Sequence, residues 1–148
     1  MSQAVNDPID PQSPIDPTTN PSGGQEAGVL FLATSRITGT YNSSEHYNRG
    51  ARGVRLNVVI SPTGPATGTA TFKIQVADPV TSTWTDLSGA TGFAINGTGA
   101  LTGALITVYP GILTGASSAN QHLGPRWRAV AVTTLDTLTF SVGADYLL

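Results

Sequence analysis

Residues 69–87 constrain the fold of this chain more than any other stretch. Four apolar residues alternate with polar ones over its first half, namely Ala70, Phe72, Ile74 and Val76, and this period of two is typical of a strand with one buried face. Asp78-Pro79 ends the ladder, because proline has no N–H to donate. Trp84 and Leu87 then begin a return strand. The stretch predicts a β-hairpin with one apolar and one polar face, on which the rest of the chain packs.

Further strands are predicted along the chain from similar apolar segments between turn residues. In residues 53–61, for example, the inward-facing residues Val54, Leu56, Val58 and Ile60 alternate with polar ones such as Arg55 and Asn57, which face outward. The other expected strands are 29–38, 93–95, 104–109, 126–133 and 137–147, with loops at 39–52 and 112–125. Seven or eight strands and no helical pattern predict an all-β chain. We expect a single β-sandwich, either a jelly roll or immunoglobulin-like.

The composition agrees with one sandwich domain, over residues 28–148, after an arm formed by residues 1–27. Charged residues make up only 11% of the 148 residues, and Thr, Ser, Gly and Ala are abundant, as suits neutral outer sheet faces. The chain has no cysteine, so disulfides and thiolate metal sites are not expected. It contains neither a secretory signal nor a long apolar run, which predicts synthesis in the cytoplasm and no membrane insertion.

The arm is rich in proline and acidic. It holds five of the ten prolines, and Pro-Ile-Asp-Pro occurs at residues 8–11 and again at 14–17, a pattern that favours extended polyproline-like backbone. At about 3.1 Å per residue such an arm spans roughly 80 Å. A solvated tail is one interpretation. The regularly placed Val5, Ile9 and Ile15 favour the other, an arm that lies across a neighbouring subunit.

Catalytic or metal-binding chemistry is not expected. The two histidines, His46 and His122, fall in predicted loops without metal-ligand spacing. Ser117-Ser118 lies close to His122 but is not part of a Gly-x-Ser-x-Gly elbow, and no phosphate-binding glycine loop is present. We therefore predict that the protein is not an enzyme and needs neither a cofactor nor a metal.

The basic residues gather in two places. Arg49, Arg52 and Arg55 lead into one predicted strand, and Arg126 and Arg128 flank Trp127 in another, where the two arginines share a face and Trp127 points to the core. A pI near 5.4 argues against nucleic acid as a partner. Bidentate pairing of the arginines with carboxylates of a protein partner suits them better, with solvated arginines as the simpler interpretation.

Several segments resemble small structural proteins of tailed bacteriophages. They are Gly53-Val54-Arg55, the hairpin at residues 71–79 with Trp84 and Leu87, Val108-Tyr109-Pro110-Gly111, residues 123–128 and Phe140-Ser141-Val142-Gly143-Ala144. The resemblance covers roughly residues 50–148 and leaves out the arm. It implies a virion protein on the capsid surface, of the decoration or cement type. Such a protein binds the major capsid protein or other virion proteins, stabilises the shell and is frequently a trimer.

Two other functions remain open from the sequence. One is a tail, neck or head-fibre component of the virion. The other is a carbohydrate-binding sandwich, with Tyr41, Tyr47 and Trp84 as a platform for sugar rings. In each case the protein acts by binding, and a homo-oligomer is expected, since a partner subunit would cover the edges of a sandwich.

Overall fold

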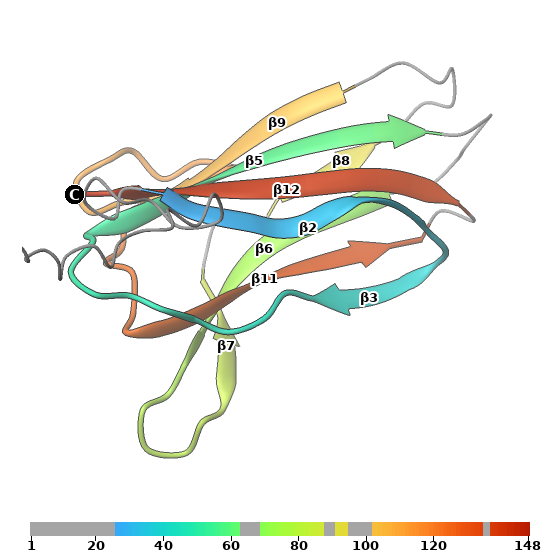
Figure 1. Cartoon of the computed structure of the whole chain (residues 1–148). Coiled ribbons are helices and arrows are strands. Elements are labelled where there is room, and N and C mark those ends of the chain that lie inside the picture. Colours follow the sequence, from blue (N-terminus) through green and yellow to red (C-terminus); the bar gives the residue numbers. More distant parts are fainter. Residues whose placement is uncertain (1–25, 63–68, 88–90, 95–101, 135–136) are drawn as a thin grey trace, which may run out of the picture.

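The protein is a sandwich of two β-sheets (Figure 1). The computed structural model describes residues 26–62, 69–87, 91–94, 102–134 and 137–148, and every regular element in these ranges is a strand. A five-stranded sheet has the order β10-β9-β5-β12-β2. Its strands are β2 (Glu26–Arg36), β5 (Gly53–Pro62), β9 (Thr102–Val108), β10 (Ser118–Ala119) and β12 (Leu138–Leu147).

The second sheet has six strands in the order β3-β11-β6-β7, with β4 also paired to β11 and β8 to β6. Its strands are β3 (Gly39–Asn42), β4 (His46–Tyr47), β6 (Thr69–Ala77), β7 (Trp84–Asp86), β8 (Thr91–Ala94) and β11 (Arg126–Thr133). The predicted all-β sandwich is therefore confirmed.

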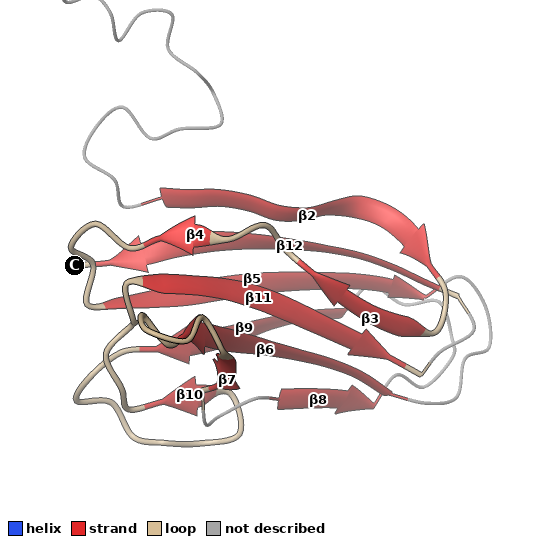
Figure 2. Ribbon diagram, turned by 90° about the horizontal axis from the view of Figure 1, so that it is seen from below, coloured by secondary structure: helices blue, strands red, loops and turns tan. Residues whose placement is uncertain are grey.

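The strand order identifies the sandwich as a jelly roll. Four antiparallel strands of one sheet, β2-β12-β5-β9, face four of the other, β3-β11-β6-β7. Along the chain, β2, β5, β9 and β12 alternate with β3, β6 and β11, so that most connections cross between the sheets (Figure 2). This is the double Greek key of a jelly roll rather than the immunoglobulin arrangement.

Alternating side chains place the core between the sheets, as the sequence predicts. In β5 Val54, Leu56, Val58 and Ile60 are all buried, and in β11 Trp127 is fully buried. The ring of Phe140 in β12 meets Phe72 of the opposite sheet edge to face, with centroids 5.1 Å apart. Aromatic pairs of this geometry stabilise a core beyond the area that they bury. One continuous core thus joins the two sheets.

Three short strands lie where the sequence predicted loops. In residues 39–52 the structure has β3 and β4, and in residues 112–125 it has β10. The predicted loops are thus wrong at these points. The reason is that β3 and β4 are held by pairing with β11, and β10 by pairing with β9, whereas their own short, polar sequences carry little strand signal.

The predicted hairpin is present as β6 and β7, with Ala77 opposite Trp84. Asp78 organises its loop, because Oδ1 accepts hydrogen bonds from the backbone N–H groups of Val80 and Thr81 at 2.7 and 2.9 Å. These N–H groups lower the pKa of the Asp78 carboxyl. Ser82 has a φ of 60°, in the left-handed region that residues other than glycine seldom adopt. The loop that precedes Trp84 therefore has a defined conformation.

The edge strand β2 is partly capped by its own last residue. The guanidinium of Arg36 donates to the carbonyl oxygens of Thr34, Phe140 and Leu32 at 2.9–3.1 Å and lies 4.1 Å from the ring centroid of Phe140. Earlier in the strand, the side chains of Val29 and Leu32 are 64% and 71% exposed. Strand β2 begins at the end of the sandwich where β12 ends and β11 begins (Figures 1 and 2).

Candidate partner-binding surface

Two of the predicted binding residues, Arg126 and Arg128, lie on the outer face of the six-stranded sheet. Trp127 between them is 0% exposed and faces the core, where its Nε1 donates to the hydroxyl of Tyr146 at 3.2 Å. The two arginines consequently project from the opposite side of β11, as expected from the alternation of a strand. The predicted orientation of Arg126, Trp127 and Arg128 is confirmed.

Trp84 lies on the same outer face, within reach of both arginines. The guanidinium carbon of Arg128 is 4.3 Å from the centroid of the Trp84 ring, and that of Arg126 is 5.9 Å away. Both distances fall in the range of cation–π attraction. Ala77, directly opposite Trp84, is only 4% exposed although it lies on this outer face. We call Trp84, Arg126 and Arg128 the Trp84 cluster.

Arg126 is fixed by two further groups. Its Nη2 donates to Oε2 of Glu45 at 2.8 Å, and its Nη1 donates to Oγ of Ser82 at 3.2 Å. The hydrogen bond to Glu45 raises the pKa of Arg126. Tyr47 pairs with Arg126 across β4 and β11. Arg126 therefore joins β4, β11 and the hairpin loop, and its charge is largely matched by Glu45.

Arg128 is fixed from one side only. Its Nε donates to Oε1 of Gln75 at 2.9 Å, and Gln75 in turn donates to Asp86 at 2.6 Å. Asp86 also pairs with Lys73 at 2.6 Å. Among the described residues, neither terminal nitrogen of Arg128 makes a hydrogen bond. Those nitrogens form the planar fork that binds a carboxylate in bidentate fashion.

The charge of Asp86 is compensated within this row of side chains. Burial by itself would raise the pKa of the Asp86 carboxyl, but the hydrogen bonds from Lys73 and Gln75 outweigh it and leave the pKa lowered. The carboxylate is consequently ionised and engaged with Lys73, so it does not neutralise Arg128. In the described part of the chain, Arg128 thus offers terminal nitrogens without hydrogen bonds beside Trp84.

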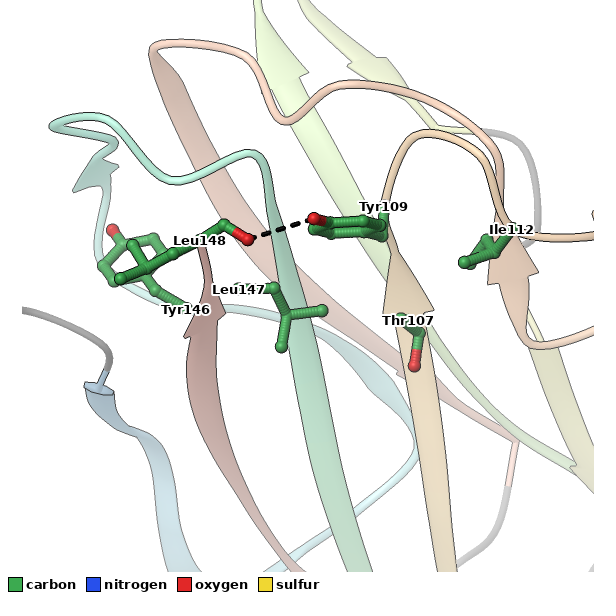
Figure 3. A pocket seen from close by; sticks show the side chains of 6 residues that line it. All are labelled: Thr107, Tyr109, Ile112, Tyr146, Leu147 and Leu148. Carbon is green, nitrogen blue, oxygen red and sulfur yellow. Dashed lines mark hydrogen bonds between the residues drawn. The ribbon is translucent and has the colours of Figure 1, made fainter.

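The other two predicted arginines lie elsewhere. The guanidinium carbon of Arg52 is 5.1 Å from the ring centroid of Tyr109, and Arg49 is exposed in the preceding loop. Tyr109 lines an open groove of about 450 Å³, where its hydroxyl donates to the carbonyl oxygen of Leu148 at 3.0 Å (Figure 3). The groove is otherwise lined by Thr107, Ile112, Tyr146, Leu147 and Leu148. The four arginines thus do not form one site.

Glu45 and His46 point in opposite directions. Glu45 binds Arg126 outside the sheet, whereas the His46 ring stacks on Trp127 at a centroid distance of 5.0 Å. Burial lowers the pKa of His46, and its buried Nε2 has no hydrogen-bond partner among the residues that the structure describes. In the described part of the chain, no three His, Cys, Asp or Glu residues are grouped so that they could hold a metal.

The aromatic platform considered for sugar binding is not assembled. Tyr41 packs against the core, with its ring centroid 6.3 Å from that of Phe140 and its hydroxyl bonded to the carbonyl of Ile37. Trp84 lies on the outer face, and Tyr47 is exposed near Arg126. Because Tyr41 faces inward, the three rings cannot present one stacking surface.

Sequence reasoning named the arginines but missed Trp84 as their partner, together with Glu45 and Gln75. The signal was the register of the hairpin, which puts Trp84 opposite Ala77 and on the face of Gln75. Val5, Ile9 and Ile15, the residues expected to anchor the arm, lie outside the described residues.

No protein-family model matches this chain, and no curated protein matches it. Over the described ranges, no helix has the length and apolarity needed to cross a membrane.

Proposed function

We propose that this protein is a structural component of a bacteriophage virion, of the capsid decoration type. It binds the outer surface of the shell, with the major capsid protein as its partner, and stabilises the shell by binding alone. The predicted arm, of which residues 1–25 precede β2, clamps neighbouring subunits. The observation that carries this proposal is that the acidic, proline-rich arm continues directly into β2, an edge strand with exposed apolar side chains.

An edge strand with an apolar surface suits a protein that is covered by a neighbour. Val29 and Leu32 of β2 and the following Ile37 are all more than half exposed. Among the described strands β2 is the last of its sheet; such an edge is a template for pairing with another chain, and exposed apolar groups gain from burial. The arm and β2 together offer a continuous contact surface for a neighbouring subunit.

The fold supports the proposal by analogy only. Jelly rolls recur in viral capsid proteins and in lectins, and a fold does not by itself assign a function. The sequence resemblance to phage structural proteins favours the first class. The inward orientation of Tyr41 counts against the second, because it separates Tyr41 from the other two rings.

The proposal is tested by co-sedimentation with shells assembled from the major capsid protein of the same phage. We expect the full chain to sediment with shells and a chain without residues 1–25 to be largely lost from the pellet, because weak contacts repeated over a lattice depend on every attachment. Leu32→Lys should also reduce binding, whereas Leu113→Lys, at another exposed leucine, should not.

Equal binding with and without the arm would refute the clamp. Absence of binding by the full chain would refute the decoration role. Rings or tubes of the isolated protein in electron micrographs would instead favour a neck or tail component.

A further inference from the structure

The Trp84 cluster has the chemistry to bind an acidic, proline-containing segment. The open fork of Arg128 can accept a carboxylate through two parallel hydrogen bonds. The Trp84 ring beside it is half-buried, and proline-rich segments dock on aromatic side chains because their backbone is already extended. A ligand with Asp next to Pro would satisfy both groups at once.

The chain itself contains such a segment. Its first 25 residues include Asp7-Pro8, Asp10-Pro11 and Asp16-Pro17 and no Lys or Arg. The rest of the chain carries more basic than acidic side chains, seven against six. Charge complementarity thus pairs the arm with the body, where Arg128 combines an aromatic neighbour, Trp84, with terminal nitrogens that make no hydrogen bond among the described residues.

We propose that the Asp-Pro steps of the arm bind the Trp84 cluster of a neighbouring copy of this chain. At about 3.1 Å per residue, Asp10 lies up to roughly 50 Å along the arm from the start of β2. The longest strand, the 11-residue β2, spans only about 36 Å. The first Asp-Pro steps can therefore extend past the body from which they start.

The spacing of the repeated motif suits attachment at more than one point. Pro-Ile-Asp-Pro recurs after six residues, which is two turns of a polyproline helix and about 19 Å. Both copies consequently present Asp on the same side of such a helix. Docking of either copy holds the arm near the neighbour and raises the effective concentration of the other.

This inference rests on the proposed function only in that the arm contacts a neighbour, and it assigns the receptor of that contact. It concerns the isolated protein, so it is tested without shells. A negative result here, combined with arm-dependent binding to shells, would refute the Trp84 cluster as the receptor and leave the decoration role intact.

Disulfide trapping between full chains tests it, because the chain has no cysteine of its own. An Ile15→Cys chain is mixed with a tagged Thr83→Cys chain, in which the new thiol is at the exposed position that precedes Trp84 in the chain, and the mixture is oxidised. We expect a disulfide between the two chains. A tagged Thr139→Cys chain, with its thiol on β12 of the other sheet, is the matched control and should give little product.

Further substitutions connect the product to the named side chains. Arg128→Gln, or Asp10→Asn with Asp16→Asn, should each lower the yield by at least about fivefold, as should high salt, since the contact is charge-assisted. Arg55→Gln, at an exposed ion pair with Asp145, should not. Equal yields at positions 83 and 139, or yields unaffected by Arg128→Gln, would overturn the proposal. The proposal would also be overturned if a chain with both Ile15→Cys and Thr83→Cys formed only the disulfide within one chain and none between two chains.

Discussion

The two tryptophans have opposite roles, and truncating each should separate them. Trp127 is fully buried, stacks on His46 and donates to Tyr146, so Trp127→Ala should lower the free energy of unfolding by about 3–5 kcal/mol through the cavity that it leaves. Trp84→Ala removes a ring from an outer face and should cost clearly less. Urea denaturation measures both. Equal losses would contradict the assignment of Trp84 to a binding surface.

His46 should make stability depend on pH. Burial lowers the pKa of His46 below its usual 6.5, so the unfolded chain takes up this proton at a higher pH than the folded protein does. The free energy of unfolding should therefore fall as the pH decreases from about 7 through 6.5 towards the folded pKa. Denaturation of wild type and His46→Gln over this range is the measurement.

The control for removal of an imidazole is His122→Gln, at an exposed loop position. Asp78 and Asp86 have pKa values lowered from 3.8, so their contributions are lost only at still lower pH. Parallel curves for wild type and His46→Gln would show that the imidazole titrates alike in both states.

For single residues, the sequence predicts which face of the sheet a side chain points to wherever apolar and polar residues alternate regularly. It does so for Val54 and Trp127, both fully buried as expected. It does not place Trp84, because the face of Trp84 depends on how β7 pairs with β6 across the loop after Asp78, and a shift of one residue would reverse it. The sequence alone therefore does not show that Trp84 contacts the arginines.

Arg36 protects the last part of strand β2, whereas the apolar side chains earlier in the strand are exposed. Its guanidinium engages the carbonyl oxygens of Thr34, Phe140 and Leu32. Arg36→Ala should lower the free energy of unfolding by about 2 kcal/mol, because these acceptors and the contact with the Phe140 ring lose their partner. Arg49→Ala is the control and should change stability by less than about 0.5 kcal/mol. Similar effects in thermal unfolding would contradict the capping role.

Long strands were predictable from their own residues, whereas short ones were not. Strand β11 has the bounds expected from its apolar run, Arg126 to Thr133. Strands β3 and β4 exist because their backbones pair with β11, and the Gly, Thr and Asn residues of β3 are equally common in loops. Their existence is a property of the sheet rather than of the segment.

The choice between a jelly roll and an immunoglobulin fold belongs to the whole molecule. Both need about the same number of alternating strands, so periodicity cannot distinguish them. The distinction arises because β12, at the end of the chain, pairs with β2 and β5, contacts between segments about a hundred residues apart. Local sequence carries little information about such partners.

The buried core formed by the described residues lies within residues 30–144. If the arm binds a neighbour's Trp84 cluster, the folded state gains stability by mass action. The Tm of the full chain should then rise with protein concentration, whereas removal of residues 1–25 or the substitution Arg128→Gln should flatten this dependence. Differential scanning calorimetry over a hundredfold range of concentration measures it. An unchanged dependence without the arm would place the association on another surface, for which the open part of β2 is the first candidate.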